Sequence, residues 1–251
     1  MLGLGAVGIL GFNLSAVIYR TRLYLGGLLY LLCSNDNKGI KSDVEDPGAA
    51  DVQEVIQRAK MIFVRHGEST WNETFNRSKN PIFFIPRIIY SCYVDLWLLL
   101  VGKRDSWFYD SPLSVTGFEQ AESLRRHLRT VQNLSDAGKI LKGDKGSSVI
   151  VSSNLRRALS TVLVGMGDRL ERAGNNEKVL VLPCLQEGGR NIDTLSITPP
   201  KQSFVPSWKD AEHEAFDMQQ AHEDHVDVSN NTTSKVCLAV SCEDRWFKRL
   251  G

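Results

Sequence analysis

Cysteine, proline and net charge are all scarce in this sequence. Its five cysteines are scattered and odd in number, and none forms the closely spaced pair of a zinc site. A disulfide framework is therefore excluded, and reduced thiols in a cytosol-like compartment are favoured. The 30 basic and 29 acidic residues leave a formal net charge of +1, so no nucleic-acid partner is expected. A length of 251 residues suits one α/β domain with appendages.

Charge is almost missing from residues 1–33, which carry only Arg20 and Arg22. The interruption at 19–22 divides this segment into two apolar runs, each short of the about 20 residues that cross a bilayer. No basic region precedes the first run and no small-residue cleavage site follows, so a removable signal peptide fits poorly. We expect residues 1–33 to anchor the protein in a membrane, as a spanning or re-entrant segment, with the catalytic domain facing the cytosol. The alternative is a buried helix or a simple N-terminal extension.

Residues 34–54 have the polar composition of a linker, and we expect the folded domain to occupy residues 55–251. Short apolar runs at 60–65, 148–152, 178–182 and 235–240 predict strands. A capping box at Thr116 predicts a helix over 116–131, and an apolar stripe predicts another over 155–170. Alternating strands and helices predict an α/β three-layer sandwich with a mostly parallel central sheet.

Residues of complementary chemistry follow three of these runs. Arg65 and His66 follow the first run, Arg157 lies after the second, and Glu187 follows the third. A neutral imidazole is a nucleophile, and a guanidinium fork matches phosphate oxygens. A nearby carboxylic acid can protonate a leaving alcohol. Because ligands bind beyond the carboxyl ends of parallel strands, these residues are expected to meet.

The motifs around these residues resemble those of the histidine phosphatase superfamily, the phosphoglycerate-mutase-like enzymes. The segments are R-H-G at 65–67, S-N-L-R-R-A-L-S-T at 153–161 and L-Q-E at 185–187, in the family order. D-S-P-L-S-V-T-G-F-E-Q-A at 110–121 resembles a further family stretch, with Ser114 where threonine is common. The similarity runs from about Met61 to Phe247 and implies a phosphoglycerate-mutase-like fold.

The resemblance also implies roles for individual residues. His66 would carry the phosphoryl group as a phosphohistidine, and Arg65 and Arg157 would bind its oxygens. Asn72 would add a supporting phosphate contact, and Glu187 would donate the proton. Such a site requires no metal and no cofactor. Glu68 is a weaker candidate for the acid because it directly follows the nucleophile loop.

A metal site elsewhere is not expected either. His213, His222 and His225 lie near acidic residues, but their spacing lacks the paired pattern of a zinc motif. A polar helix face followed by a loop is the simpler interpretation.

The sequence departs from the family pattern at two places. Cys242 stands where the family carries a second histidine that contacts the phosphoryl group. Residues 74–109 are a long insertion, in which Pro86 can start an apolar helix with Arg87, Ser91 and Asp95 as a polar stripe. We expect this helix to cap the active site, to rest on a membrane surface or to pack on the N-terminal segment.

Three functions follow from these features. The leading hypothesis is a phosphatase of phosphomonoesters, whose partner is a small phosphorylated metabolite or a phosphoprotein. A phosphoglycerate-mutase-type phosphotransferase would use the same residues but would have to exclude water. A catalytically impaired phospholigand-binding protein at a membrane is the third, and Cys242 is the feature that favours it.

We expect Cys242→His to raise phosphatase turnover by about tenfold or more, because a thiol is a weak donor and carries no positive charge. Losing one donor to a developing charge costs about 10²–10³ in rate elsewhere. Steady-state kinetics on the best substrate of a phosphomonoester panel measures the change. Unchanged turnover in both Cys242→His and Cys242→Ala would show that Cys242 does not occupy the position of the family histidine.

Overall fold

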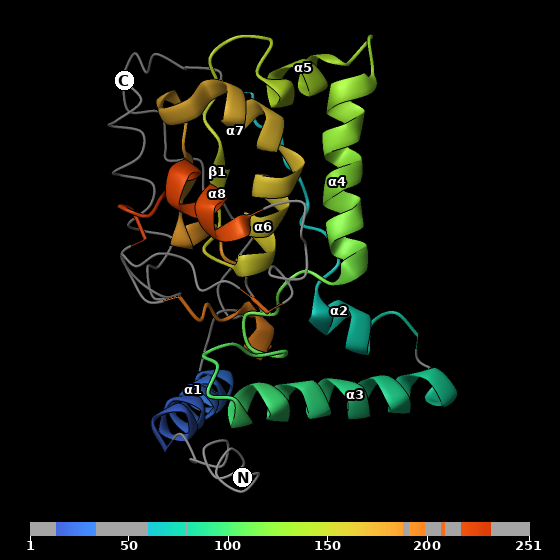
Figure 1. Cartoon of the computed structure of the whole chain (residues 1–251), viewed down its shortest axis with the longest axis vertical. Coiled ribbons are helices and arrows are strands. Elements are labelled where there is room, and N and C mark those ends of the chain that lie inside the picture. The colour runs from blue at the N-terminus through green and yellow to red at the C-terminus, as the bar shows by residue number, and fades with distance from the viewer. Residues whose placement is uncertain are drawn as a thin grey trace, which may run out of the picture.

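A computed structural model describes residues 14–33, 60–78, 80–187, 191–198, 207–208 and 217–231. In these ranges helices surround a small sheet (Figure 1). The α-helices are α1 Leu14–Cys33, α2 Thr70–Phe75, α3 Pro81–Leu100, α4 Val115–Thr130, α5 Asp136–Lys142, α6 Arg156–Gly165, α7 Gly167–Ala173 and α8 Met218–His225. The strands are β1 Val151–Ser152, β2 Val179–Val181 and β3 Val226–Asp227, and the short 3-10 turns are η1 Gly174–Asn176, η2 Pro183–Leu185 and η3 Ile192–Thr194.

The sheet is parallel throughout, in the order β1-β2-β3. Its strands and the helices between them confirm an α/β fold in the coarse sense. The strands predicted at 148–152 and 178–182 are present, although each is shorter than its apolar run. The third strand, β3, was not predicted because the chain around Val226 is mostly polar and has no apolar run.

The strand predicted at 60–65 is wrong for the described structure. These residues have no regular secondary structure, and the side chains of Met61 and Phe63 are 73% and 84% exposed. A strand is held by hydrogen bonds to a neighbour, and no described segment pairs with 60–65. The isolated bridge between Ser69 and Leu113 follows it instead. The strand predicted at 235–240 lies outside the described residues.

The main core lies between the sheet and the helices α4, α6 and α8. Its buried apolar side chains are Leu113, Phe118, Ala121, Ile150, Leu159, Leu163, Val164, Met166, Leu170, Val179, Val181, Met218 and Val226. These side chains include Leu159, Met166 and Leu170 from the apolar stripe that predicted a helix over 155–170. That helix is broken into α6 and α7 at Met166, which Gly165 and Gly167 flank, because glycine is a poor helix former.

Two helix starts differ from prediction. Helix α4 is capped by Ser114 and not by Thr116, since the Ser114 hydroxyl accepts the Gly117 N–H at 3.1 Å. Helix α3 begins at Pro81 and not at Pro86. A proline at the first position loses no intrahelical hydrogen bond, and the Asn80 side chain caps the turn.

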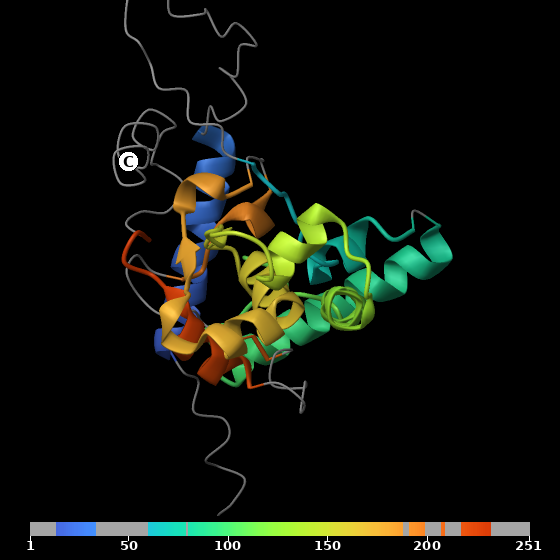
Figure 2. The same ribbon diagram turned by 90° about the horizontal axis from the view of Figure 1, so that it is seen from above.

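Helices α1 and α3 form the base of the molecule, below the sheet and its helices in Figure 1. They contact each other at one end and diverge from there, as Figure 2 shows. Helix α1 continues through the predicted interruption at 19–22, so that division into two runs is wrong for the part described. The reason is that Arg20 is buried against α3, where it donates to Asp95 at 2.8 Å. Tyr24 donates to the same carboxylate at 2.9 Å.

The predicted polar stripe of α3 faces the body of the protein. Arg87 donates to backbone carbonyls of α2 and of the loop after it, at 3.0 and 2.6 Å. Ser91 shares a hydrogen bond of 2.8 Å with Thr74, and Asp95 accepts the Trp107 N–H at 2.9 Å. The three residues of the polar stripe therefore all bond to the rest of the protein. Helix α3 also packs on the N-terminal helix α1, which is one of the three placements expected from the sequence.

We expect Arg20→Met to lower the free energy of unfolding by about 3–5 kcal/mol, because it leaves the Asp95 carboxylate, whose side chain is only 15% exposed, without the cation that pairs with it. Arg22→Met is the matched control, since Arg22 lies on the same helix and is exposed; its effect should stay within about 0.5 kcal/mol. Urea unfolding of the full chain in a mild detergent measures both. Equal stability of the two variants would show that α1 is not held by this ion pair.

Candidate active site

A polar pocket of about 310 Å³ opens beside the nucleophile candidate. It combines residues from the loop 65–68 with residues from α2, from the loop after α2 and from α4. The lining residues are Arg65, His66, Gly67, Glu68, Asn72, Asn76, Arg77 and Gln120. Arg157 and Glu187 do not line it; they approach His66 from α6 and from the residues after η2.

The imidazole of His66 is oriented by its own loop. Its Nδ1 lies 2.6 Å from the Gly67 carbonyl oxygen, and a carbonyl only accepts, so Nδ1 carries the proton. Nε2 then holds a lone pair, 4.0 Å from the Glu187 carboxylate. Burial lowers the pKa of His66, and the positive charges of Arg157 and Arg65 lower it further. The Gly67 carbonyl and the Glu187 carboxylate act in the opposite direction, but they do not outweigh burial. The neutral, nucleophilic form is therefore favoured at pH 7.

The loop itself is fixed by close backbone packing. The Gly67 N–H donates to the hydroxyl of Thr161, the last residue of the second motif, at 3.0 Å. A Cβ added at Gly67 would lie 2.5 Å from the Gly117 carbonyl, and one at Gly117 would lie 2.1 Å from the Glu68 carbonyl. Only glycine at both positions lets the nucleophile loop and the start of α4 touch.

Arg157 is buried to 1% exposure in the first turn of α6. It donates to the Glu187 carboxylate and to the Asp193 carbonyl, both at 2.7 Å. The helix N-terminus adds positive potential at this point. Three of the predicted residues, His66, Arg157 and Glu187, are thus brought together from three different segments.

The carboxyl group of Glu187 is charged in this arrangement. Burial alone would raise the pKa of Glu187, but the hydrogen bond and charge of Arg157, with His66 and Arg65, lower it below its usual value. An anion that bound Arg157 would displace this carboxylate and place negative charge next to it. Both changes raise a carboxyl pKa, so phosphate binding itself would convert Glu187 into a proton donor.

The other predicted phosphate ligands are at the pocket. Arg65 is exposed and lines it directly. Asn72 projects from α2, and its side-chain oxygen accepts from Asn76 at 2.7 Å, which leaves the NH₂ group of Asn72 to donate. Cys242 lies outside the described residues.

Glu68, the weaker acid candidate, is occupied by structural bonds. It accepts from Arg77 at 2.8 Å and from Ser114 at 2.9 Å. Arg77 belongs to the insertion, and sequence reasoning missed it because it lies in none of the quoted motifs. Gln120, which accepts the Glu68 N–H at 2.9 Å, was missed although it lies within a quoted segment.

The histidine cluster contributes no site in the part of the chain that is described. His222 is buried on α8, where burial lowers its pKa to about 4, while His213 lies outside the described ranges. No group of three or more His, Cys, Asp and Glu side chains among the described residues could hold a metal ion.

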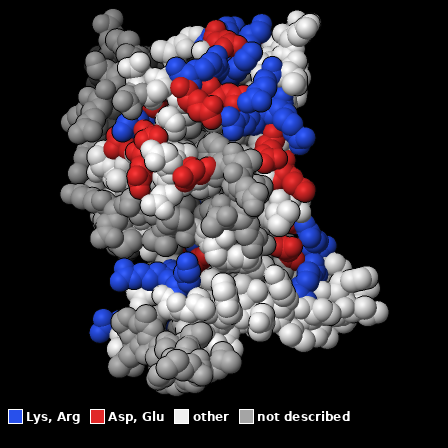
Figure 3. All heavy atoms as spheres, viewed as in Figure 1, with Lys and Arg blue, Asp and Glu red and all other residues white. Residues whose placement is uncertain are grey.

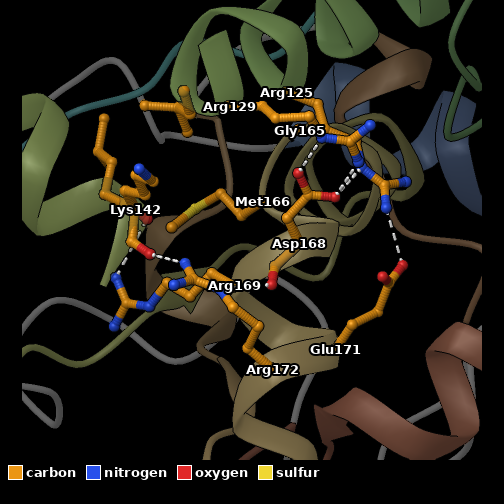
Figure 4. A pocket seen from close by; sticks show the side chains of 11 residues that line it. Arg125, Arg129, Lys142, Gly165, Met166, Asp168, Arg169, Glu171 and Arg172 are labelled. Atoms are coloured by element: carbon orange, nitrogen blue, oxygen red, sulfur yellow. Dashed lines mark hydrogen bonds and ion pairs between the residues drawn. The ribbon is translucent and has the colours of Figure 1, made fainter. Parts of the chain in front are cut away.

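A larger cavity of about 440 Å³ lies between α4, α5, α6 and α7, away from His66. Figure 4 shows that its charged side chains bond to one another. Asp168 accepts from Arg125 at 2.6 Å and from Arg129 at 2.6 and 2.8 Å, and these bonds lower the pKa of Asp168 to about 2. Each basic side chain of the lining forms an ion pair with a carboxylate, either in the lining or beside it at Asp144 and Glu177. The described lining of this cavity also lacks a nucleophile like His66.

Comparison with protein-family models, with curated proteins and with solved structures gives no match for this chain. Function is therefore inferred from the geometry of the site and from the resemblance of its motifs. A fold alone would not define a function in any case.

We expect the pKa of His66 to lie below its ordinary value of about 6.5 and to fall further in Glu187→Gln, which removes a charge that favours the imidazolium. Because activity needs neutral His66, activity of the wild type should be lost as the pH falls through this pKa. Long-range ¹H–¹⁵N spectra measure the pKa and the protonated nitrogen. His222 is the internal control and should still titrate near pH 4. A raised His66 pKa would contradict the assigned geometry.

Proposed function

We propose that the chain is a phosphatase of phosphomonoesters that acts through a phosphohistidine on His66. The observation that carries the proposal is the approach of a neutral His66 Nε2 to the Arg157–Glu187 ion pair, next to a pocket that Arg65 lines. We further propose that the domain has the three-layer, phosphoglycerate-mutase-like arrangement of the histidine phosphatase superfamily.

In the first half-reaction the phosphate group takes the place of the Glu187 carboxylate on Arg157. Arg65 and the Asn72 amide bind other oxygens, which aligns phosphorus with Nε2. Nε2 then forms the N–P bond while the P–O bond to the substrate alcohol breaks. Glu187, protonated once it has left Arg157, gives its proton to the departing oxygen.

In the second half-reaction water attacks the phosphohistidine. The Glu187 carboxylate accepts a proton from the water, a new P–O bond forms and the N–P bond breaks. His66 is released neutral with the proton still on Nδ1, held by the Gly67 carbonyl. Inorganic phosphate then leaves Arg157, and Glu187 returns to it.

Exposure of Glu187 favours the phosphatase over the mutase. Its side chain is 57% exposed, so water reaches the proton donor directly. A mutase has to keep water from the phosphohistidine until a second alcohol has bound. The third hypothesis, an impaired phospholigand-binding protein, depends on Cys242 and shares the same phosphate ligands.

Trapping with a ³²P-labelled phosphomonoester tests the proposal. We expect an acid-labile, alkali-stable adduct on His66 that is lost in His66→Ala and retained in His127→Ala, a control at an exposed histidine of α4. Arg157→Ala should weaken phosphate binding by about tenfold or more, because it removes a buried charge-assisted donor. Arg172→Ala, at an exposed arginine of the second cavity, should not.

Three results would contradict the proposal. These are an adduct on serine, retention of the adduct in His66→Ala, and equal phosphate affinity in wild type and Arg157→Ala. Binding of phosphomonoesters without any adduct or phosphate release would favour the impaired phospholigand-binding protein instead.

A further inference from the structure

Helix α3 carries a long row of apolar side chains that face solvent. Each of the following is at least 44% exposed: Ile82, Phe83, Ile85, Ile89, Tyr90, Tyr93, Leu96, Trp97 and Leu100. Among the helices of the described residues, α3 alone is long and apolar enough to cross a membrane, and only 17% of its most apolar window is buried. The side of α3 opposite the polar stripe is therefore uncovered.

Helix α1 extends this apolar surface. Its exposed large side chains are Ile18, Leu25, Leu28, Leu29 and Leu32. The two helices are in contact at the base of the molecule, and Figure 3 shows that the base over α3 is almost bare of charge. We call the exposed apolar side chains of both helices the basal face. Large exposed apolar patches mark sites that bind a membrane or a protein partner.

The contacts of α3 show how this helix would meet a bilayer. A helix that crossed the membrane would have to take Arg87, Ser91 and Asp95 out of their bonds with the body and into hydrocarbon. Unpaired charges at that depth are strongly unfavourable. With these bonds intact, one side of α3 stays on the protein while the other side is free to enter lipid. Such a helix lies in the plane of the interface.

The composition of the basal face and its border indicates lipid as the occupant. Tyr90, Tyr93 and Trp97 are aromatic residues with a polar group, the type enriched where hydrocarbon meets headgroups. Arg22, Lys103 and Arg104 are exposed around the face, and basic side chains line its border in Figure 3. Basic residues at this depth attract anionic headgroups. Residues 1–12, which precede α1, contain no charged residue.

We propose that α1 and α3 form a membrane-binding face that lies flat in the headgroup and acyl-chain boundary of an anionic bilayer. This goes beyond an anchor in residues 1–33, because α3 supplies much of the face and neither helix crosses the membrane. The proposal is independent of the phosphatase chemistry. Arg87 of α3 donates to backbone carbonyls in α2, which carries Asn72, and at Ser78 after it, so the phosphate pocket lies next to the membrane-bound base.

Fluorescent labels on single cysteines test the depth of the face. Cys92 is exposed on α3 and Cys184 is exposed in η2, so each can be left as the sole cysteine of the full chain and labelled with NBD. On vesicles of phosphatidylcholine and phosphatidylserine, the Cys92 label should shift its emission to the blue and be quenched by nitroxide lipids. The Cys184 label should keep its emission in buffer.

Labels at Ile82→Cys, Ile89→Cys and Leu96→Cys decide between a flat and a crossing helix. A flat helix predicts similar quenching at all three, stronger from a nitroxide near the headgroup than from one at the chain end. Quenching that peaks at the bilayer centre for the middle position would show a crossing helix and overturn the proposal. Two other results would overturn the proposal: cosedimentation with vesicles while the emission of the Cys92 label stays unshifted, and no binding to vesicles at all. Either result would indicate that a protein partner or a second copy covers this face.

Charge reversal at the border tests the anionic preference. Lys103→Glu with Arg104→Glu should weaken binding to phosphatidylserine vesicles by about tenfold or more. Arg126→Glu with Lys139→Glu is the matched control, because it makes the same change of net charge at exposed positions of α4 and α5. Equal losses in the two double variants would show a general charge effect and would contradict the proposed orientation. None of these measurements requires turnover, so they can fail or succeed separately from the phosphatase proposal.

Discussion

Arg156 has no exposed surface, and its guanidinium group joins the base of the molecule to the start of α6. It donates to the Asp105 carboxylate at 2.5 Å and to the Asp110 carbonyl at 2.9 Å. The Asp105 carbonyl in turn accepts from Arg20 of α1. A buried ion pair adds little net stability, but separating its partners leaves an uncompensated buried charge. Arrangements of α1, the 105–110 loop and α6 that break these bonds are therefore disfavoured. The base and the site are therefore parts of one packed unit.

Arg157, the next residue on α6, is also a buried arginine, but its guanidinium group has other partners. Arg157 is equally buried, but it is directed to Glu187 and to the side of His66. The Asp110 carboxylate accepts the Arg156 N–H at 3.0 Å and the Ile197 N–H at 2.9 Å, so it holds the first turn of α6 in place. Burial raises the pKa of Asp110, which Arg156 and these hydrogen bonds oppose. Arg156 therefore has a structural role, while Arg157 is the residue proposed to bind the phosphate group.

The parts of this arrangement that motifs carry could be predicted from sequence. The rule that functional residues gather after parallel strands accounts for Arg157, which follows β1, and for Glu187, which follows β2. His66 joins them without a strand before it, so its place was expected for a reason that the structure does not bear out. The polar stripe of α3 was visible as helical spacing. The bonds made by Arg20 and Arg77 could not be predicted, because each depends on a partner in a distant segment that no local pattern reveals. The strand expected at 60–65 failed for a similar reason, since a strand also depends on its neighbour.

The insertion 74–109 links the proposed chemistry to the proposed membrane face. Its first part places Arg77 at the pocket, and its middle part, α3, forms much of the basal face. Its last part contains Asp105, which bonds to Arg156, the neighbour of the proposed phosphate ligand Arg157. A shift of α3 would break the Asp95 bonds to Arg20 and Trp107, and buried polar groups would lose their partners. Movement of the base relative to the site is therefore unfavourable. If both proposals hold, the insertion fixes the distance between His66 and the membrane surface at which a substrate would bind.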